Sequence, residues 1–229
     1  MKVNEFYNTT YTKTQLEGDK NRRDRIRFLF PEIPQGLKVL DIGCGPAVDI
    51  DFLLKGSNEV HGIDMGDAAL SLAQAKGVVT RKFDLMSDEP LPYDKASFDL
   101  IIANDILEHL FDPSFLLTEC SRVIRDTGIL IASVPNHFYW KMRLRVLLGR
   151  DIILPFHRES KQWDYFHIRF FTSTGFEELL YKTGFSIVEK HYDRFITVPR
   201  GFPRPVDHRL ARKFPDLFSM HFLVKAVKK

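Results

Sequence analysis

The chain has 229 residues, 44% of which are hydrophobic, and its formal net charge is +3. This length suits one domain with a large core, and the small charge argues against the strongly basic surface of a nucleic-acid-binding domain. The only two cysteines, Cys44 and Cys120, form no CxxC pair, which argues against a disulfide scaffold or a zinc ribbon. Because we find neither an apolar signal core nor a run of roughly 20 apolar residues, we expect a cytoplasmic protein without a membrane span.

Residues 17–30 carry Ile26, Leu29 and Phe30 on one side and charges elsewhere, which predicts an amphipathic helix that ends at Pro31. After it, short apolar runs alternate with helical patterns. The apolar runs predict strands over 37–42, 59–64, 78–84, 97–104 and 128–135. The helical patterns predict helices over 48–55, over 67–76 with Asp67 as N-cap, and over 113–125, opened by Asp112 and Pro113. This order indicates a doubly wound α/β fold with a mainly parallel sheet and helices on both faces.

The alternation stops after Pro135. Residues 137–166 are rich in aromatic and basic side chains, which predicts a cap insertion over one end of the sheet. The pattern then predicts a helix over 172–184, closed by Gly184, strands over 185–193 and 219–228, and a proline-rich loop over 194–218. We therefore expect an N-terminal segment and helix over 1–36 and one domain over 37–229.

The first predicted strand ends in a glycine turn. Gly43 and Gly45 lack side chains where a ligand has to approach the backbone, and the helix expected next would offer free N–H groups. Asp41 places one carboxylate at this strand end, and Asp64 places another at the next, where it can accept both hydroxyls of a ribose. Val48 replaces the third glycine of a dinucleotide fingerprint. These features favour a ligand with an ammonium group and a ribose, such as S-adenosylmethionine (SAM), over a diphosphate.

The third predicted strand ends in a further acidic residue, Asp84. Its carboxylate could accept the exocyclic amine of an adenine, and the backbone of Leu85 could read the ring edge. Taken alone, Asp84 has a loop-capping role as an equal alternative. Three acidic strand ends in series favour adenosyl binding.

These residues resemble the class I SAM-dependent methyltransferases, whose motifs match over about residues 37–228. The similarity implies a Rossmann-like methyltransferase fold of seven strands, the last antiparallel, with SAM as cofactor. The matching segments are VLDIGCGPA (39–47), with Ala47 where a third glycine is common, EVHGIDM (59–65), FDLIIANDILEHLFDP (98–113), RVIRDTGILIASVPN (122–136) and HIRFFTSTGFEELLYKTGF (167–185). The last of these resembles a bacterial and archaeal subgroup often found with sugar, lipid or natural-product biosynthesis.

The resemblance also implies which positions bind SAM. The glycine turn would lie alongside the methionine part of SAM, and Asp41 would order the amino group of that part. Asp64 and Met65 would hold the ribose and flank the adenine, and Asn104 would lie near the sulfonium. The full set of implied cofactor-binding residues is Asp41, Gly43, Cys44, Gly45, Asp64, Met65, Asp84, Leu85 and Asn104.

Methyl transfer to a hydroxyl requires that the reactants are aligned, that water is excluded and that a base accepts the hydroxyl proton. Histidine suits this role because its ordinary pKa is about 6.5. His137 follows the fifth strand end and His167 lies where the chain returns to the sheet, so we predict these two as catalytic; a packing or surface role is the alternative for each. His109 and His157 are further candidates.

The insertion carries residues that could recognise an acceptor. Its aromatic residues either stack on the acceptor or form a small cap core: Tyr139, Trp140, Trp163, Tyr165 and Phe166. The basic residues around it form either a solvated face or a site for an anionic acceptor, such as a carboxylate or a phosphorylated sugar: Lys141, Arg143, Arg145, Arg150, Arg158 and Arg169.

Asp105, Glu108 and His109 have the spacing of one helix face, and with His167 they would make a divalent-cation set. This set is similar to that of metal-binding small-RNA 3′-end methyltransferases and of some quinone-pathway O-methyltransferases, where Glu is usual at position 105. The LEH triplet is also widespread in methyltransferases without metal, in which it braces the helix. We therefore predict no metal.

The sequence thus predicts a SAM-dependent methyltransferase that acts on an oxygen or nitrogen of a small molecule, such as a sugar, lipid or secondary-metabolite intermediate. One alternative is a metal-assisted methyltransferase of RNA ends, and another is a SAM-binding partner subunit without turnover. A nicotinamide oxidoreductase is disfavoured by Asp41 and Val48. Oligomeric state has no signature in the sequence.

Overall fold

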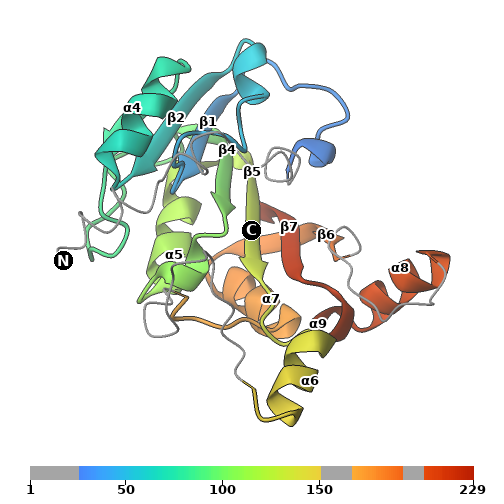
Figure 1. Cartoon of the computed structure of the whole chain (residues 1–229). Helices are drawn as coiled ribbons and strands as arrows, with labels where there is room; N and C mark the ends of the chain where they lie inside the picture. The colour runs from blue at the N-terminus through green and yellow to red at the C-terminus, as the bar shows by residue number, and fades with distance from the viewer. Residues whose placement is uncertain (1–25, 151–166, 193–203) are drawn as a thin grey trace. The chain divides into compact units, whose positions relative to one another are not determined.

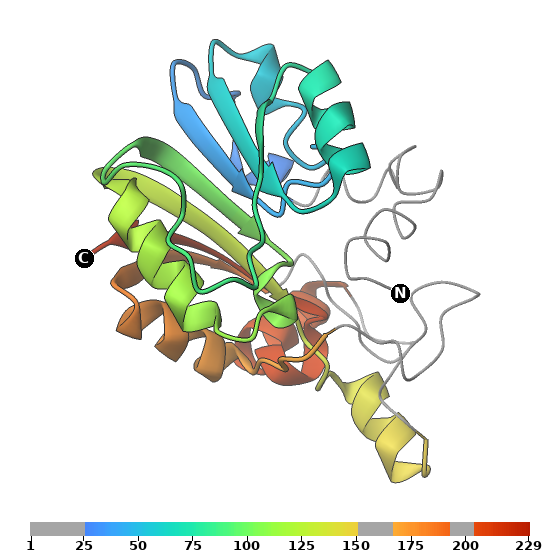
Figure 2. The ribbon, with the colours of Figure 1, turned by 90° about the vertical axis from the view of Figure 1, so that its left-hand side faces the viewer.

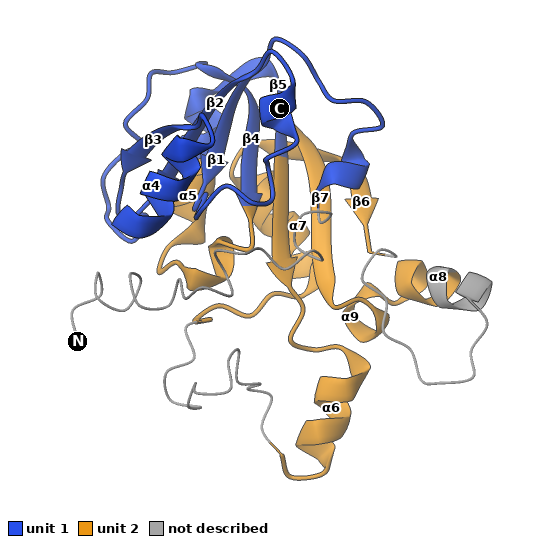
Figure 3. Cartoon of the chain, turned by 45° about the horizontal axis from the view of Figure 1, so that its top comes forward, with its two compact units in different colours: residues 1–103, 119–130, 228 blue, residues 104–118, 131–227, 229 orange. Residues whose placement is uncertain are grey.

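The computed structural model describes residues 26–150, 167–192 and 204–229. The chain divides into two compact units (Figure 3). Unit 1 contains residues 1–103, 119–130 and 228, and unit 2 contains residues 104–118, 131–227 and 229.

Seven strands form a sheet in the order β3-β2-β1-β4-β5-β7-β6 (Figure 1). Strand β1 pairs in parallel with β2 and β4, and β2 pairs in parallel with β3. The order reverses between β1 and β4, which is where doubly wound sheets bind ligands. The predicted α/β fold class and all seven predicted strands are confirmed. Their bounds are β1 Lys38–Ile42, β2 Glu59–Asp64, β3 Val79–Lys82, β4 Phe98–Asn104, β5 Ile124–Pro135, β6 Phe185–His191 and β7 His221–Lys228.

The strands on either side of the reversal form the core of unit 1. Their apolar residues are buried on both faces, as expected for the central strands of a parallel sheet: Val39, Leu40 and Ile42 on β1, and Leu100, Ile101 and Ile102 on β4. Helix α4 (Asp67–Ala75) buries Ala69, Leu70 and Ala73 and packs on β2 and β3. This packing holds β2 and β3 in place.

Two predicted helices in unit 1 are wrong in their described parts. Over 48–55 the chain forms turns and one 3-10 turn, η2 (Leu53–Lys55). The left-handed backbone of Ala47, with φ 53°, turns the chain away from a helical path just before it. In the predicted helix over 17–30, the described residues form only the 3-10 turn η1 (Arg27–Leu29), and residues 17–25 lie outside the described ranges.

The predicted N-cap of α4 is also wrong. Gly66 occupies the N-cap position, and Asp67 is the first helical residue. The carboxylate of Asp67 instead forms an ion pair with Lys82, at 2.6 Å. The role expected of Asp67 is partly taken by Asp64, whose Oδ1 accepts the N–H of Gly66 at 2.8 Å.

Two other helices begin as their sequences predict. Helix α5 (Pro113–Val123) is opened by Asp112, whose Oδ1 accepts the N–H groups of Ser114 and Phe115 at 2.9 and 3.1 Å. Helix α7 (Ser173–Lys182) is capped by Thr172, whose side chain accepts the N–H of Gly175. After α7, Gly184 takes a φ of 95°, which lets the chain turn into β6.

The predicted loop over 194–218 is wrong where the structure describes it. This stretch contains helices α8 (Arg204–Lys213) and α9 (Pro215–Phe218). Pro215 opens α9, because a proline in the first turn lacks only an N–H group that has no helical acceptor there. Prolines therefore mark a helix start here, and not a loop.

The predicted insertion begins with helix α6 (Trp140–Leu147), and its residues 151–166 lie outside the described ranges. Among the residues that the structure describes, every helix is too short or too polar to cross a bilayer.

Candidate functional site

The turn after β1 has a left-handed backbone. Gly43 and Gly45 have φ values of 69° and 50°, a region that glycine enters without strain, and Ala47 follows at 53°. The N–H groups of Gly43 and Cys44 both donate to the carbonyl of Ile63, at 2.9 and 3.0 Å. These bonds fix the turn against the end of β2.

Asp64 connects the ends of β1 and β2. Its carboxylate is buried; Oδ2 accepts the N–H of Gly45 at 2.9 Å, and Oδ1 accepts that of Gly66 at 2.8 Å. Burial raises the pKa of Asp64, and the backbone donors of Gly66, Gly45 and the half-buried Met65 oppose this rise. Since a carboxylate has about four lone-pair positions, Asp64 retains capacity for a ribose hydroxyl. The sequence indicated the ligand role but not this structural one.

Two buried carboxylates make the turn electronegative. Asp41 and Asp64 are each only 6% exposed. Burial, followed by the charges of Asp41 and Asp64, raises the pKa of the Cys44 thiol. The predicted ligand position is therefore suited to a cationic group and unfavourable for a diphosphate.

Cys44 is buried, and its side chain packs against Gly62 of β2. A Cβ on Gly62 would lie 2.7 Å from Cys44 Sγ, so this close contact requires glycine. Because the Cys44 side chain is buried, only the backbone of this predicted site residue can line the ligand site. Sequence reasoning missed Gly62, although a glycine inside a strand is a known signal of close approach.

Asp84 follows β3 and is exposed. Its Oδ1 accepts the N–H of Met86 at 2.9 Å, and its carbonyl accepts the hydroxyl of Ser87 at 2.6 Å. The loop-capping alternative for Asp84 is thus present in the structure. Leu85, the second residue expected at the adenine, is half-buried.

In unit 2, the end of β4 is built around Ser133. The Ser133 hydroxyl lies 2.7 Å from both Asn104 Oδ1 and Asp105 Oδ1. Asp105 has a φ of 52°, a strained value for a residue other than glycine, and such strain is concentrated at functional sites. Its Oδ2 lies 3.9 Å from His221 Nε2. Sequence reasoning missed both Ser133 and His221; a serine inside the apolar β5 run was the one available signal.

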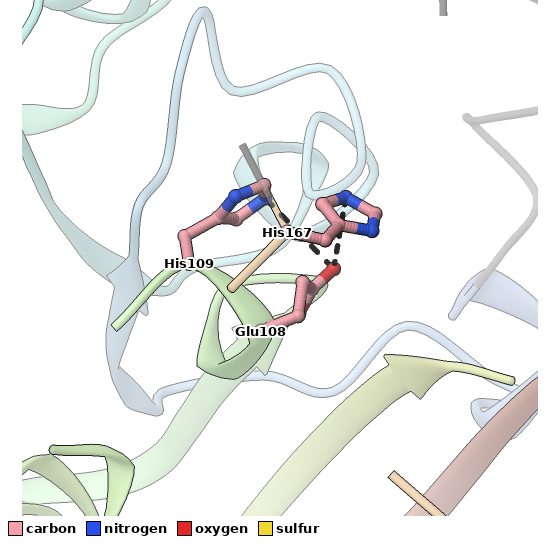
Figure 4. Close-up of side chains that lie close together, drawn as sticks. All are labelled: Glu108, His109 and His167. Carbon is pink, nitrogen blue, oxygen red and sulfur yellow. Dashed lines mark ion pairs between the residues drawn. The ribbon is translucent and has the colours of Figure 1, made fainter. Parts of the chain in front are cut away.

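Glu108, His109 and His167 converge beside this end of the sheet (Figure 4). Glu108 is 1% exposed, and its Oε1 lies 3.9 Å from the Nε2 atoms of both His109 and His167. Each residue offers one ligand atom, and the three atoms lie within 4.8 Å of one another. Asp105 is not a member of this group, so three of the four candidate metal ligands are brought together.

Backbone hydrogen bonds bring His167 to this cluster. Glu108 and His109 lie on the 3-10 turn η3 (Leu107–His109), just after β4. The Glu108 carbonyl accepts the N–H groups of Ile168 and Arg169, at 2.9 and 3.1 Å. The segment that carries His167 is therefore fixed to the residue whose carboxylate it faces.

His137 and His167, the two predicted catalytic residues, also meet. Their Nε2 and Nδ1 atoms lie 3.0 Å apart, and both side chains are buried. Burial and the charge of His221 lower the pKa of His137 to about 4, against the opposing effect of the Pro135 carbonyl. Burial, His109 and His137 lower the pKa of His167 to about 3. Both imidazoles are therefore neutral at pH 7, the form that accepts a proton or binds a metal.

The candidate base His157 lies outside the described ranges, as do four candidates for acceptor recognition: Arg158, Trp163, Tyr165 and Phe166. Tyr139 is buried and Trp140 is half-buried.

Comparison with known proteins gives a consistent result. A family model described as a methyltransferase domain matches residues 15–190. A ubiquinone biosynthesis O-methyltransferase from Hahella chejuensis is 32% identical over 136 residues, which cover 57% of each chain. The chain spans about half the length of the curated relatives that it matches.

Solved structures share the fold. An S-adenosylmethionine-dependent methyltransferase from Mesorhizobium loti superposes with a TM-score of 0.61 at 20% identity, covering 89% of this chain and 95% of that chain. Phosphoethanolamine N-methyltransferase 2 from Haemonchus contortus, solved with S-adenosyl-L-methionine, gives a TM-score of 0.65 at 18% identity, covering 100% of this chain and 60% of that chain.

Proposed function

We propose that this chain, which belongs to the methyltransferase domain family, is a SAM-dependent methyltransferase that acts on an oxygen or nitrogen of a small-molecule acceptor. A sugar, lipid or secondary-metabolite intermediate is the acceptor class that we favour. The observation that carries the proposal is the pair of buried carboxylates, Asp41 and Asp64, at the glycine turn where the sheet order reverses. Their field attracts an ammonium and a sulfonium and repels phosphates.

Each cofactor residue has a distinct part in this proposal. Asp41 orders the amino group of the methionine portion, and Asp64 accepts a ribose hydroxyl while its other lone pairs hold Gly45 and Gly66. Gly43 and Gly45 let the ligand approach the backbone. Asp84 and Leu85 contact the adenine, and Asn104 lies toward the sulfonium. When bound, SAM supplies an electrophilic methyl group.

The acceptor is prepared by the histidines of unit 2. A hydroxyl must lose its proton as the methyl group is transferred, and a neutral imidazole can receive it. We assign this role to His137 and His167, since their 3.0 Å contact links one ring to the other. A neutral amine acceptor has less need of a base, so the loss of both imidazoles would slow methyl transfer to an amine less than transfer to a hydroxyl.

Calorimetric titration of the full chain with SAM, and separately with S-adenosylhomocysteine, tests the cofactor assignment. We expect saturable heat from both compounds. A protein that gave neither heat nor a thermal shift with either compound would overturn the proposal. Incubation with methyl-labelled SAM and panels of hydroxyl and amine compounds then identifies the acceptor class.

Metal-assisted methyl transfer to a hydroxyl is a second candidate function, and the convergence of Glu108, His109 and His167 favours it. Two imidazoles and one carboxylate suit ions such as Zn²⁺, Mn²⁺ or Fe²⁺. Bonds of about 2.0–2.2 Å to one ion separate its ligand atoms by roughly 3–4 Å. The 3.9 Å separations of Glu108 Oε1 from the two Nε2 atoms fit that range, and all three ligand atoms lie within 4.8 Å of one another. A bound cation would lower the pKa of a hydroxyl beside it.

The two candidates differ in their response to chelation. Methyl transfer that persists after removal of all bound metal would exclude the metal-assisted function and leave the first intact. Loss of transfer with retention of SAM binding, restored by adding back one divalent ion, would support the second.

A further inference from the structure

Helix α6 exposes an apolar stripe. Leu144, Leu147 and Leu148 follow the i, i+3, i+4 spacing of one helix side and are 44%, 81% and 62% exposed. Trp140, one turn earlier on the same side, is half-buried. On the opposite side of the helix, Met142 is buried and Val146, one turn later, is 55% exposed. The helix thus turns its apolar stripe outward, the reverse of a helix that packs its apolar side on a core.

Basic side chains accompany this stripe. Lys141 and Arg143 flank it on its two sides, Arg145 lies one turn beyond Lys141, and Arg150 follows the helix. The sequence contains no Asp or Glu from residue 127 to residue 150. An apolar stripe bordered by bases is the pattern of helices that lie in the surface of an anionic bilayer.

Among the described elements of its own unit, α6 is positioned for such contact. In Figures 1 and 2, α6 extends away from β6, β7 and α7 of the same unit. Its eight residues span about 12 Å, against a bilayer core of roughly 30 Å, so the geometry suits surface binding and not crossing.

We infer that α6 is a peripheral membrane-binding helix. It lays Leu144, Leu147 and Leu148 into the interface of an anionic bilayer, while Lys141 and the neighbouring arginines contact lipid phosphates. A second copy of this chain is a poorer occupant, because pairing the stripes would bring the like charges of Lys141, Arg143 and Arg145 together. This inference is independent of the proposed function.

Co-sedimentation of the full chain with vesicles tests the inference. We expect binding to phosphatidylcholine vesicles that contain phosphatidylglycerol, little binding to pure phosphatidylcholine, and weaker binding as salt rises. The variant Leu147→Glu/Leu148→Glu should lower the partition coefficient by about tenfold or more, because a charge is costly in an apolar interface. Leu72→Glu, at an exposed leucine of α4, is the matched control and should bind like the wild type.

A second readout uses Trp140. The chain has two tryptophans, so Trp163→Phe leaves Trp140 as the sole reporter. Its emission should shift to the blue with anionic vesicles and stay unchanged with neutral ones. Circular dichroism and SAM titration of every variant establish that the fold is retained.

The inference is overturned if the wild type fails to bind anionic vesicles, or if the double glutamate variant binds them as well as the wild type does. A dimer in sedimentation velocity that the double variant dissolves, without any vesicle binding, would also overturn it and assign the stripe to self-association.

Discussion

His137 Nε2 and His167 Nδ1 lie 3.0 Å apart, inside unit 2. One ring must donate and the other accept, so a single proton fixes the tautomers of both. A third ring, His109, meets His167 edge to face with centroids 4.7 Å apart. The arrangement keeps imidazole lone pairs available at neutral pH in a buried setting, which both candidate mechanisms require.

The first prediction concerns stability against pH. The pKa values of His137 and His167 are about 4 and about 3 in the folded chain, against about 6.5 in the unfolded chain. The unfolded state therefore binds protons first, and stability falls as the pH drops from about 6.5 toward 4, by up to about 1.4 kcal/mol per pH unit for each ring. Chemical denaturation of chelator-treated protein measures this slope.

The control for that experiment is a pair of variants. His137→Gln/His167→Gln should flatten the slope over this pH window, whereas Val188→Gln, at an exposed residue of β6 without a titratable group, should leave it unchanged. An equal slope in the double variant would show that other groups cause the acid destabilisation.

The second prediction concerns Asp64. Asp64→Ala should weaken SAM binding about 100-fold or more, because each hydrogen bond to a charged group contributes about 1.5–3 kcal/mol. It should also lower stability by about 1–3 kcal/mol, since the N–H groups of Gly45 and Gly66 lose their acceptor. Calorimetry well below the melting temperature separates these effects. As a control, Asp67→Ala removes a nearby exposed carboxylate and should bind SAM normally. A near-normal SAM affinity of Asp64→Ala would refute the assignment of Asp64 to the ribose.

The third prediction concerns the contact of Gly62 with Cys44. Gly62→Ala should cost about 1–3 kcal/mol, because its Cβ would lie 2.7 Å from Cys44 Sγ. Cys44→Ala removes that sulfur. The double variant should therefore lose less free energy of unfolding than the sum of the losses in the two single variants. A double-mutant cycle from urea unfolding measures the coupling. Additive effects would show that a side chain at position 62 does not clash with Cys44. As a separate control, Cys44→Ala alone should keep its affinity for SAM.

The fourth prediction concerns metal content. If the second candidate function holds, protein equilibrated with Zn²⁺ or Mn²⁺ and then dialysed should retain the ion, as measured by elemental analysis. Glu108→Gln and His167→Ala should lose it. His137→Phe, which removes the hydrogen-bond partner of His167, should weaken binding by about 10–100-fold. His191→Ala is the matched control, and equal metal in Glu108→Gln and the wild type would exclude the site.

The positions of the strands along the chain and their acidic ends could be predicted from the sequence, because they depend on local patterns. Short strand patterns followed by Gly43, Asp64 or Asp84 mark strands and the turns that end them; β1 and β2 are mostly buried, whereas β3 is exposed. The error over 48–55 has an equally local cause: apolar spacing is consistent with a helix there, but it does not encode the left-handed backbone at Ala47. Spacing reports which side of a segment is apolar and leaves the path of the chain undetermined.

By itself, the sequence determined the fold class, the methyltransferase resemblance and the two catalytic candidates, His137 and His167. Only the tertiary structure decided that these rings share a hydrogen bond, that Glu108 rather than Asp105 faces His167, and that His221 belongs to the same group. The physical reason is separation along the chain. These contacts form when the chain pairs strands and folds the segment at 167–169 back on Glu108, so their free energy depends on long-range packing that no local pattern records.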